Sequence, residues 1–425
     1  MLERLELRDV GPAPSMQLDF GPRLNLFTGD NGLGKTFLLD VAWFALTDTW
    51  PGYPAAPHRG PGVEPEIVQV MRHGEVVHRV TSSFDFANQS WETSLSREAS
   101  ERPDVVFYAR VDGSFSIWDP LREAGHVHFP LGSISWGAVP GFHFTPKEIW
   151  NGLTADDHDK TVLCNGLIRD WVTWQLQRSD TFAILTRVLE VLSPEPGETI
   201  RPGASTTRVS VHDVRDVPTI DLPYGTIPVV LASAGMKRIL SLAYLLVWTW
   251  REHVETAKLK NTAPARSMVV LVDEVEAHLH PRWQRVILPA LLRVVQELEA
   301  SIEVQFFITT HAPLVLASAE PHFDEARDAL FVLDLEGGRV EISKPPWAPR
   351  GDASAWLTSD VFDLAQARSV EAERAILQAM AAMRQPDLPI EEVKRIHHEL
   401  RAVLKDTDPF WARWLARAKR AGIDP

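Results

Sequence analysis

The chain has 425 residues, of which 45% are apolar, with a formal net charge of −14 and a pI of about 5.5. This size allows a large core in two or three structural units, and the acidic charge opposes nucleic-acid binding except through a local basic surface. Cys164 is the only cysteine and no apolar run is long enough to span a membrane, so we expect a cytoplasmic protein without an intrachain disulfide.

Residues 1–145 are predicted to begin an α/β core. Apolar spacing predicts a helix over Phe37–Leu46, and alternating or apolar runs predict strands. The predicted strands are Leu2–Leu7, Met16–Phe20, Leu24–Thr28, Glu66–Val70, Glu75–Ser82, Val105–Ala109 and Phe115–Trp118. We assign the last four of these to an antiparallel layer.

Residues 146–203 are predicted to form a helical lobe, residues 204–350 to complete the core, and residues 351–425 to form a helical C-terminal extension. The lobe helices are expected at Pro146–Gly152, Lys160–Gln177 and Ser179–Leu192, with Trp150, Trp171 and Trp174 as apolar anchors. The later elements are expected at Arg208–Val211, Ile227–Leu231, Ser267–Val272, Glu303–Thr309, Ala329–Leu335 and Arg339–Ser343 for strands, and at Ala234–Ala257 and Pro281–Leu298 for helices.

A glycine-rich stretch joins the predicted strand Leu24–Thr28 to the predicted helix. It matches G-x-x-x-x-G-K-[ST] and consists of Gly29, Asp30, Asn31, Gly32, Leu33, Gly34, Lys35 and Thr36. A strand, a glycine turn and a helix N-terminus direct backbone N–H groups at a phosphate. Lys35 would reach the β- and γ-phosphates of ATP, and the Thr36 hydroxyl would bind Mg²⁺.

A second element of this site is the apolar strand Ser267–Val272, which ends in Asp273 and Glu274. Asp273 would lie beside Mg²⁺, and Glu274 would act as the general base for the attacking water. Two acids at a turn are weak evidence alone. Together with the glycine-rich loop they predict nucleotide hydrolysis.

Two further positions fit a phosphate site. Ser233 precedes a long helix and Gly235 follows two residues later. The hydroxyl, a backbone N–H and the helix dipole would bind an anion, although Ser233 is also an ordinary N-cap residue. His311 follows the strand Glu303–Thr309 and could contact the γ-phosphate.

In order and spacing, G-D-N-G-L-G-K-T, S-A-G-M-K-R, L-V-D-E-V-E-A-H-L-H-P and I-T-T-H-A-P-L-V resemble the motifs of ABC-type ATPases, in particular the SMC, RecF and OLD branch. The resemblance covers roughly residues 2–335. It implies a Walker A loop at Gly29–Thr36, a Walker B pair at Asp273 and Glu274, a signature motif at Ser233 and Gly235, and a switch histidine at His311.

The resemblance also implies a homodimer, or a higher even-numbered oligomer, with ATP between the Walker A loop of one copy and the signature loop of the other. The C-terminal part is similar to the tails of ATPases from anti-phage systems such as Septu. We therefore expect a separately encoded effector, such as a nuclease, in phage defence or DNA maintenance. The alternatives are a RecF-like DNA clamp, which leaves DNA contact open, and the nucleotide-binding subunit of a transporter.

One residue of this class has no counterpart. ABC-type ATPases usually have a glutamine, the Q-loop residue, before the helical lobe, and Trp91–Trp174 contains none. Gln89, another polar group such as Asp119, or water alone could take its place. The turn Glu276–Pro281 has two histidines, but zinc needs three or four ligands, so a turn at the dimer interface is the better interpretation.

Overall fold

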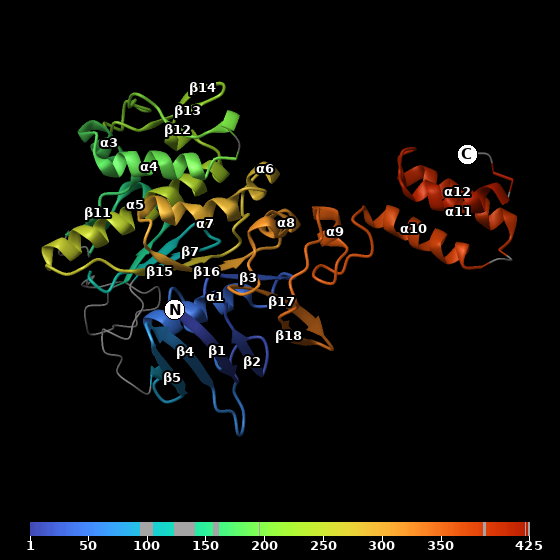
Figure 1. The fold of residues 1–425 in the computed structure, drawn as a ribbon, viewed down its shortest axis with the longest axis horizontal. Helices are drawn as coiled ribbons and strands as arrows, with labels where there is room; N and C mark the ends of the chain where they lie inside the picture. Colours follow the sequence, from blue (N-terminus) through green and yellow to red (C-terminus); the bar gives the residue numbers. More distant parts are fainter. Residues whose placement is uncertain are drawn as a thin grey trace. The chain divides into compact units, whose positions relative to one another are not determined.

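The fold is that of a computed structural model, which describes residues 1–93, 105–122, 141–155, 161–194, 196–385, 388–420 and 422–423 (Figure 1). By their internal contacts the residues divide into two units, Met1–Pro349 and Arg350–Pro425. In the described residues the first unit contains two large β-sheets, two small ones (β10-β11 and β12-β13-β14) and most of the helices. The second is entirely helical in its regular elements.

An eight-stranded sheet forms the centre of the first unit, in the order β18-β17-β3-β16-β15-β7-β8-β9. Strands β17, β3, β16, β15 and β7 run parallel, and antiparallel strands flank them. Their bounds are β3 Leu24–Gly29, β7 Val105–Ala109, β8 Phe115–Trp118, β9 Gly141–Phe144, β15 Ser267–Val272, β16 Glu303–Thr309, β17 Asp328–Glu336 and β18 Arg339–Ser343. Every residue of β3 and β7 is buried, as expected for parallel strands covered on both faces.

A second, antiparallel sheet has the order β2-β1-β4-β5-β6. Its strands are β1 Leu2–Arg8, β2 Ser15–Asp19, β4 Glu66–His73, β5 Val76–Asp85 and β6 Ser90–Thr93. The assignment of Val105–Ala109 and Phe115–Trp118 to this layer is wrong, because both strands belong to the central sheet. Strand β1 is only partly buried, whereas all residues of β7 and β8 are buried, which requires cover on both faces.

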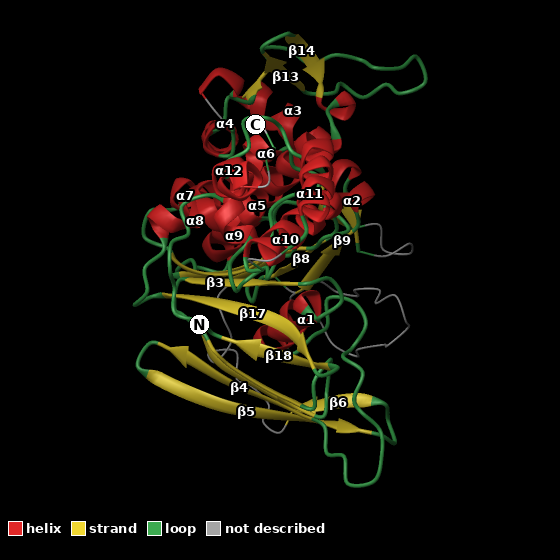
Figure 2. Cartoon of the chain, turned by 90° about the vertical axis from the view of Figure 1, so that its right-hand side faces the viewer, coloured by secondary structure: helices red, strands yellow, loops and turns green. Residues whose placement is uncertain are grey.

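Helix α1 (Lys35–Thr47) lies between the two sheets (Figure 2). Its buried residues, among them Leu39 and Trp43, share one apolar core with Leu5 of β1 and Leu271 of β15. The helix is buried on nearly all sides, so it has little amphipathic character. The glycine-rich loop is therefore fixed to a helix that is held by both sheets.

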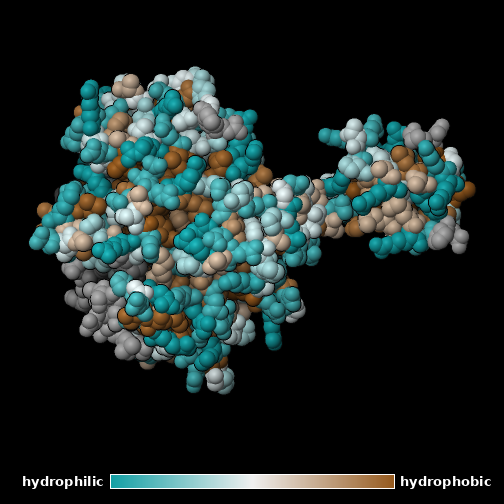
Figure 3. Space-filling model, viewed as in Figure 1, coloured by the Kyte–Doolittle hydropathy of each residue, from teal (hydrophilic) through white to brown (hydrophobic). Residues whose placement is uncertain are grey.

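Helices α5 (Ala234–Leu259), α6 (Pro281–Gln284), α7 (Ile287–Leu298) and α8 (Pro313–Ala319) lie on the other face of the central sheet (Figures 1 and 2). The predicted helix Pro281–Leu298 is interrupted after Gln284, giving α6 and α7. On the face drawn in Figure 3, hydrophobic residues are interspersed among hydrophilic ones over these helices. The predicted strands Ser267–Val272 and Glu303–Thr309 are confirmed at both ends.

Of the three tryptophans predicted as anchors of the helical lobe, Trp171 and Trp174 are fully buried, whereas Trp150 is half-buried. The elements of the lobe are α2 Pro146–Asn151, β10 Leu153–Thr154, β11 Val162–Cys164, α3 Leu167–Gln177, α4 Asp180–Val191, η2 Pro196–Glu198 and β12 Arg201–Pro202, followed by β13 Thr219–Leu222, β14 Gly225–Pro228 and η3 Val229–Leu231. Helix α3 starts later than predicted because β11 precedes it. The strand predicted at Arg208–Val211 is absent: its valines, Val209 and Val211, are exposed, so the alternation has no core to face.

The second unit contains α9 (Ala353–Leu357), α10 (Val370–Met383), α11 (Ile390–Val403) and α12 (Phe410–Arg420). Helices α10, α11 and α12 enclose a core of their own, in which Trp414 is fully buried. Phe410, Trp411 and Trp414 therefore pack internally. In the described parts of both units, no helix is long and apolar enough to cross a membrane.

Candidate nucleotide-binding site

The glycine-rich loop connects the end of β3 to the first turn of α1. Gly34 precedes the helix with a φ of 99°, and no side chain caps the helix N-terminus. The first N–H groups of α1 are therefore available to an anion, and Asp30, Asn31 and Gly32 are exposed to solvent. A Cβ at Gly34 would lie 2.7 Å from Cγ of Pro12, so the backbone conformation and the close packing both require glycine here.

Lys35 lies inside the loop. Its ammonium group donates to the carbonyl oxygens of Gly29 (2.9 Å) and Asp30 (2.7 Å), and the residue is 5% exposed. Burial lowers the pKa of Lys35, while the carboxylates of Glu274 and Asp273 act in the opposite direction. A phosphate would replace weak carbonyl acceptors by a full negative charge, which favours transfer of the ammonium to the phosphate.

Asp273 follows β15 and is 1% exposed. Its Oδ2 accepts a hydrogen bond from the Thr36 hydroxyl at 2.8 Å, and its Oδ1 accepts one from the Thr309 hydroxyl at 2.7 Å. A hydroxyl and a carboxylate facing each other beside a phosphate loop fit Mg²⁺, which binds to few protein oxygens and keeps waters or phosphates as its other ligands. Thr36 and Asp273 would hold this ion.

Glu274 and His311 lie together on neighbouring strand ends. His311 Nε2 is 3.6 Å from Glu274 Oε1, and both side chains are partly exposed. The backbone of Glu274 has a φ of 43°, an unusual conformation for a residue other than glycine. The backbone N–H of Glu274 donates a hydrogen bond to the Thr309 hydroxyl at 2.7 Å, which helps to hold this conformation.

Ser233 is exposed and caps α5 by accepting a hydrogen bond from Met236 N–H at 3.3 Å. A Cβ on Gly235 would lie 2.5 Å from the carbonyl oxygen of His278, so the first turn of α5 packs closely on the turn Glu276–Pro281. In the described part of the chain, neither Ser233 nor Gly235 forms a hydrogen bond with the loop 29–36. The structure thus brings Lys35, Thr36, Asp273, Glu274 and His311 into one linked group without these two residues.

Neither residue considered for the Q-loop role lies at this site. Gln89 is exposed in the turn between β5 and β6, where it bonds Arg59 and the carbonyl of Phe86. Asp119 follows β8 at the end remote from Asp273, and its Oδ1 is 2.9 Å from His253 Nδ1.

Sequence reasoning also missed four residues around the Walker B strand: Asp40, Tyr108, Arg110 and Arg238. Tyr108 donates to Asp40 Oδ1 at 3.0 Å, and Arg110 Nη1 lies 3.9 Å from the same oxygen. Arg238 donates to the backbone carbonyl of Asp273 at 2.8 Å. No local pattern marks these residues, because their partners come from distant segments.

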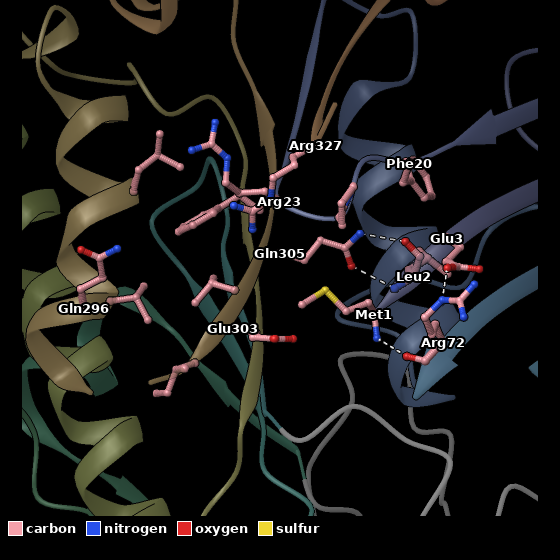
Figure 4. Close-up of a pocket in the computed structure, with 16 residues that line it drawn as sticks. Met1, Leu2, Glu3, Phe20, Arg23, Arg72, Gln296, Glu303, Gln305 and Arg327 are labelled. Carbon is pink, nitrogen blue, oxygen red and sulfur yellow. Dashed lines mark hydrogen bonds and ion pairs between the residues drawn. The ribbon is translucent and has the colours of Figure 1, made fainter. Parts of the chain in front are cut away.

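A cavity of about 610 Å³ lies at the other end of the strands, lined by the first residues of β16, Glu303–Phe306 (Figure 4). The side-chain amide of Gln305 bonds both the N–H and the carbonyl of Leu2 there, which joins the two sheets. Arg72, also at this cavity, is paired with Glu3. None of the predicted site residues lines it.

Residues 218–317 match the family described as "AAA domain, putative AbiEii toxin, Type IV TA system". The "Retron Ec83 probable ATPase" of Escherichia coli is 33% identical over 98 residues, which are 23% of this chain and 15% of that protein. The "Septu protein PtuA" of Bacillus thuringiensis is 20% identical over 439 residues, with 96% of each protein covered. The chain is similar to retron ATPases and to a Septu protein.

The retron matches are local. The "Retron Vc95 probable ATPase" of Vibrio cholerae is 27% identical over 31% of this chain and 24% of the relative, so both retron matches span less than a quarter of those proteins. Among solved structures, the SMC head domain from Thermotoga maritima covers 81% of this chain and 98% of its own, with 15% identity and a TM-score of 0.39. A RecF structure has 12% identity and a TM-score of 0.37, with 80% and 98% covered. These scores are too low to support a functional comparison.

Proposed function

We propose that this protein is an ABC-type ATPase that binds and hydrolyses ATP with Mg²⁺, and that ATP holds two copies together. The observation that supports this most directly is the hydrogen bond between the Thr36 hydroxyl and Asp273, 2.8 Å long, directly behind an uncapped helix N-terminus. It joins the phosphate loop to the strand that carries Glu274. ATP hydrolysis needs both parts within one site.

Each residue of the linked group has one proposed role. Lys35 binds the β- and γ-phosphates after leaving its two carbonyl acceptors, and the N–H groups of the loop bind the same phosphates. Magnesium, held by Thr36 and Asp273, would neutralise charge that develops on the phosphate oxygens. Glu274 accepts the proton of the attacking water, and His311, beside it, senses the γ-phosphate.

The exposed Ser233 forms no hydrogen bond with the loop 29–36 of its own subunit in the described chain, so an anion bound there would come from a second copy. The Ser233 hydroxyl and the start of α5 would bind the γ-phosphate of ATP held by a second copy. Because the same relation holds in reverse, the dimer closes with twofold symmetry and contains two nucleotides. ATP then stabilises the closed dimer by binding it better than the open monomers.

The proposed ATPase would act on a separately encoded effector, a nuclease, in phage defence or DNA maintenance. The relation to retron and Septu ATPases supports a defence role. A change between open and closed dimers would provide the signal for such a partner. This part of the proposal rests on similarity to the retron and Septu proteins, since no described surface identifies the effector.

DNA binding by the second unit is the alternative function. Helix α12 contains no acidic residue and carries Arg413, Arg417, Lys419 and Arg420. Three of them are exposed, and phosphate contacts by such side chains would weaken steeply with salt. An ATP-dependent gel shift that disappears with rising salt supports this alternative, and the absence of a shift at low salt removes it.

The decisive experiment is mass photometry of Glu274→Gln with and without MgATP. Without its base the variant should bind ATP, fail to hydrolyse it and accumulate as a dimer. Lys35→Ala is the matched control and should remain monomeric because phosphate binding is lost. A Glu274→Gln protein that binds ATP and stays monomeric would contradict the shared site.

A further inference from the structure

Strand β7, which lies beside β15, is followed directly by Arg110. Strand β7 pairs with β15 in parallel, with Ala109 opposite Val272, and Asp273 N–H donates to the carbonyl of Ala109 at 2.9 Å. Arg110 is therefore the strand-end neighbour of Asp273. Alternate residues of both strands, including Tyr108 on β7, face the core that contains α1. By the two-residue repeat, Arg110 and Asp273 point to this same side.

Helix α1 presents two oxygen-bearing side chains to these strand ends. Thr36 and Asp40 are four residues apart and so lie on one face of the helix, one turn from each other. Thr36 donates to Asp273 on β15, whereas Asp40 reaches across to β7, where Tyr108 donates to it. The two pairs lie side by side, and Asp40 is an additional acidic group next to the magnesium residues.

The carboxylate of Asp40 has no close ion pair: the cationic nitrogen nearest to it in the described chain is Arg110 Nη1, at 3.9 Å. Asp40 Oδ1 accepts from Tyr108 and lies 3.9 Å from Arg110 Nη1, a nitrogen that already donates to the carbonyl of Pro51 at 2.8 Å. No donor in the described chain bonds its Oδ2, and this oxygen is not sealed from solvent. Burial raises the pKa of Asp40 to about 6, with Arg110 opposing and Asp273 adding to the rise.

The Asp40 side chain is 21% exposed, so its second oxygen can be reached by water. Asp40 therefore has one tethered oxygen and one open oxygen. The tether restricts the carboxylate to one orientation, and the open oxygen can accept a hydrogen bond. Water held by Mg²⁺ is the donor to be expected at this position, because the ion keeps several waters when protein ligands are few.

We propose that Asp40, oriented by Tyr108 and Arg110, is a positioning residue that accepts hydrogen bonds from water in the magnesium shell of the bound nucleotide. It would provide the polar group next to Asp273 for which the sequence offers no glutamine. This inference rests on the proposed function, since it requires ATP and Mg²⁺ in the loop 29–36. It assigns no direct metal contact to Asp40.

The test is the affinity of a fluorescent ATP analogue measured with Mg²⁺ and again with EDTA. We expect Asp40→Asn to reduce the magnesium-dependent gain in affinity roughly tenfold, as for loss of one charge-assisted hydrogen bond, and to leave the affinity in EDTA unchanged. Arg110→Ala should reduce the same gain, by a smaller factor, because it loosens the orientation of Asp40. The full-length chain is used throughout.

Asp170→Asn is the matched control. Asp170 is also a buried carboxylate, bonded by the Tyr244 hydroxyl at 2.8 Å, and its pKa is raised by burial, but it belongs to the helical lobe. Its substitution should leave the magnesium-dependent gain unchanged. A wild-type gain in folded Asp40→Asn overturns the inference while ATP binding by the wild type still stands. If the wild type and Lys35→Ala both fail to bind the analogue, the proposed function itself has failed.

Discussion

The guanidinium of Arg238 donates a hydrogen bond to the backbone carbonyl of Asp273 at 2.8 Å. The same side chain bonds the carbonyls of Arg110 at 3.2 Å, Val111 at 3.1 Å and Glu274 at 3.3 Å. One cation therefore donates hydrogen bonds to four carbonyl oxygens at two strand ends. Because Arg238 lies on α5, the helix that begins after Ser233 is attached to the segments that carry Asp273 and Glu274.

This attachment predicts a selective defect in Arg238→Ala. The strand ends would keep their hydrogen bonds within the sheet but lose their link to α5, so we expect nucleotide affinity to change by less than about threefold and hydrolysis to fall by about tenfold or more. Nucleotide affinity and single-turnover hydrolysis are measured on the same preparation. Lys237→Ala is the control, since no hydrogen bond of its side chain is found among the described residues. Equal losses in both variants would rule out a specific role for Arg238.

The glycine-rich loop could be predicted from the sequence, whereas the contacts of Arg238 could not. A phosphate loop needs consecutive residues between a strand and a helix, so the sequence alone can predict one at Gly29–Thr36. Arg238 contacts carbonyls up to 128 positions away along the chain. Backbone carbonyls leave no signature in the sequence, and neither does the reach of Asp40 to Tyr108. Such residues are found only when the chain is folded.

In the fold, too, local features could be predicted from the sequence and long-range pairing could not. Buried strands such as Ser267–Val272 are predicted well because an apolar run bounded by polar residues is a local signal. The run Val105–Ala109 is equally clear as a strand, but its sequence does not reveal which sheet it joins. That choice depends on pairing with β15, which lies far along the chain. The break between α6 and α7 and the late start of α3 are likewise set by neighbouring elements.

Close packing at Gly235 predicts that Gly235→Ala disrupts the start of α5. A methyl group would lie 2.5 Å from the carbonyl oxygen of His278, so the helix or the turn must move. We expect a loss of stability of about 1–3 kcal/mol and loss of ATP-dependent association, while the isolated copy still binds ATP. Thermal unfolding and mass photometry measure the two effects. Gly197→Ala is the control, because nothing lies within 4 Å of a Cβ there. ATP-dependent association of two Gly235→Ala copies would show that the turn Glu276–Pro281 can move to make room for the methyl group.

The separate core of the second unit predicts that it can unfold alone. Trp414 is fully buried, and its Nε1 donates to His397 Nδ1 at 3.2 Å. Trp414→Ala should cost about 3–5 kcal/mol, enough to unfold a small helical unit. Limited proteolysis should then cleave after residue 350 while nucleotide affinity is retained. Leu377→Ala, at a site 44% exposed on α10, should have little effect on either measurement. Loss of nucleotide binding in folded Trp414→Ala would argue against independent units.

The raised pKa of Asp40 predicts a pH-dependent gain in stability for Asp40→Asn. The pKa is about 6 in the folded protein against 3.8 as a free group, so the folded state binds more protons than the unfolded state between these values. Stability from this group is therefore lost as pH rises through that interval. The shift of about two pKa units corresponds to about 3 kcal/mol at most, and the neutral asparagine avoids this cost.

The measurement is the difference in melting temperature between Asp40→Asn and the wild type, without nucleotide or metal, from pH 4.5 to 8. Other titrating groups are common to both proteins and cancel in the difference, so the gain should rise from roughly a third of its full value at pH 4.5 to a plateau above about pH 7. The same substitution should weaken magnesium-dependent nucleotide binding. Opposite signs for stability and binding would mark Asp40 as a group retained for function at the expense of the fold. A difference that does not change with pH would show that Asp40 is already ionised at the acid end, and the burial argument would be wrong.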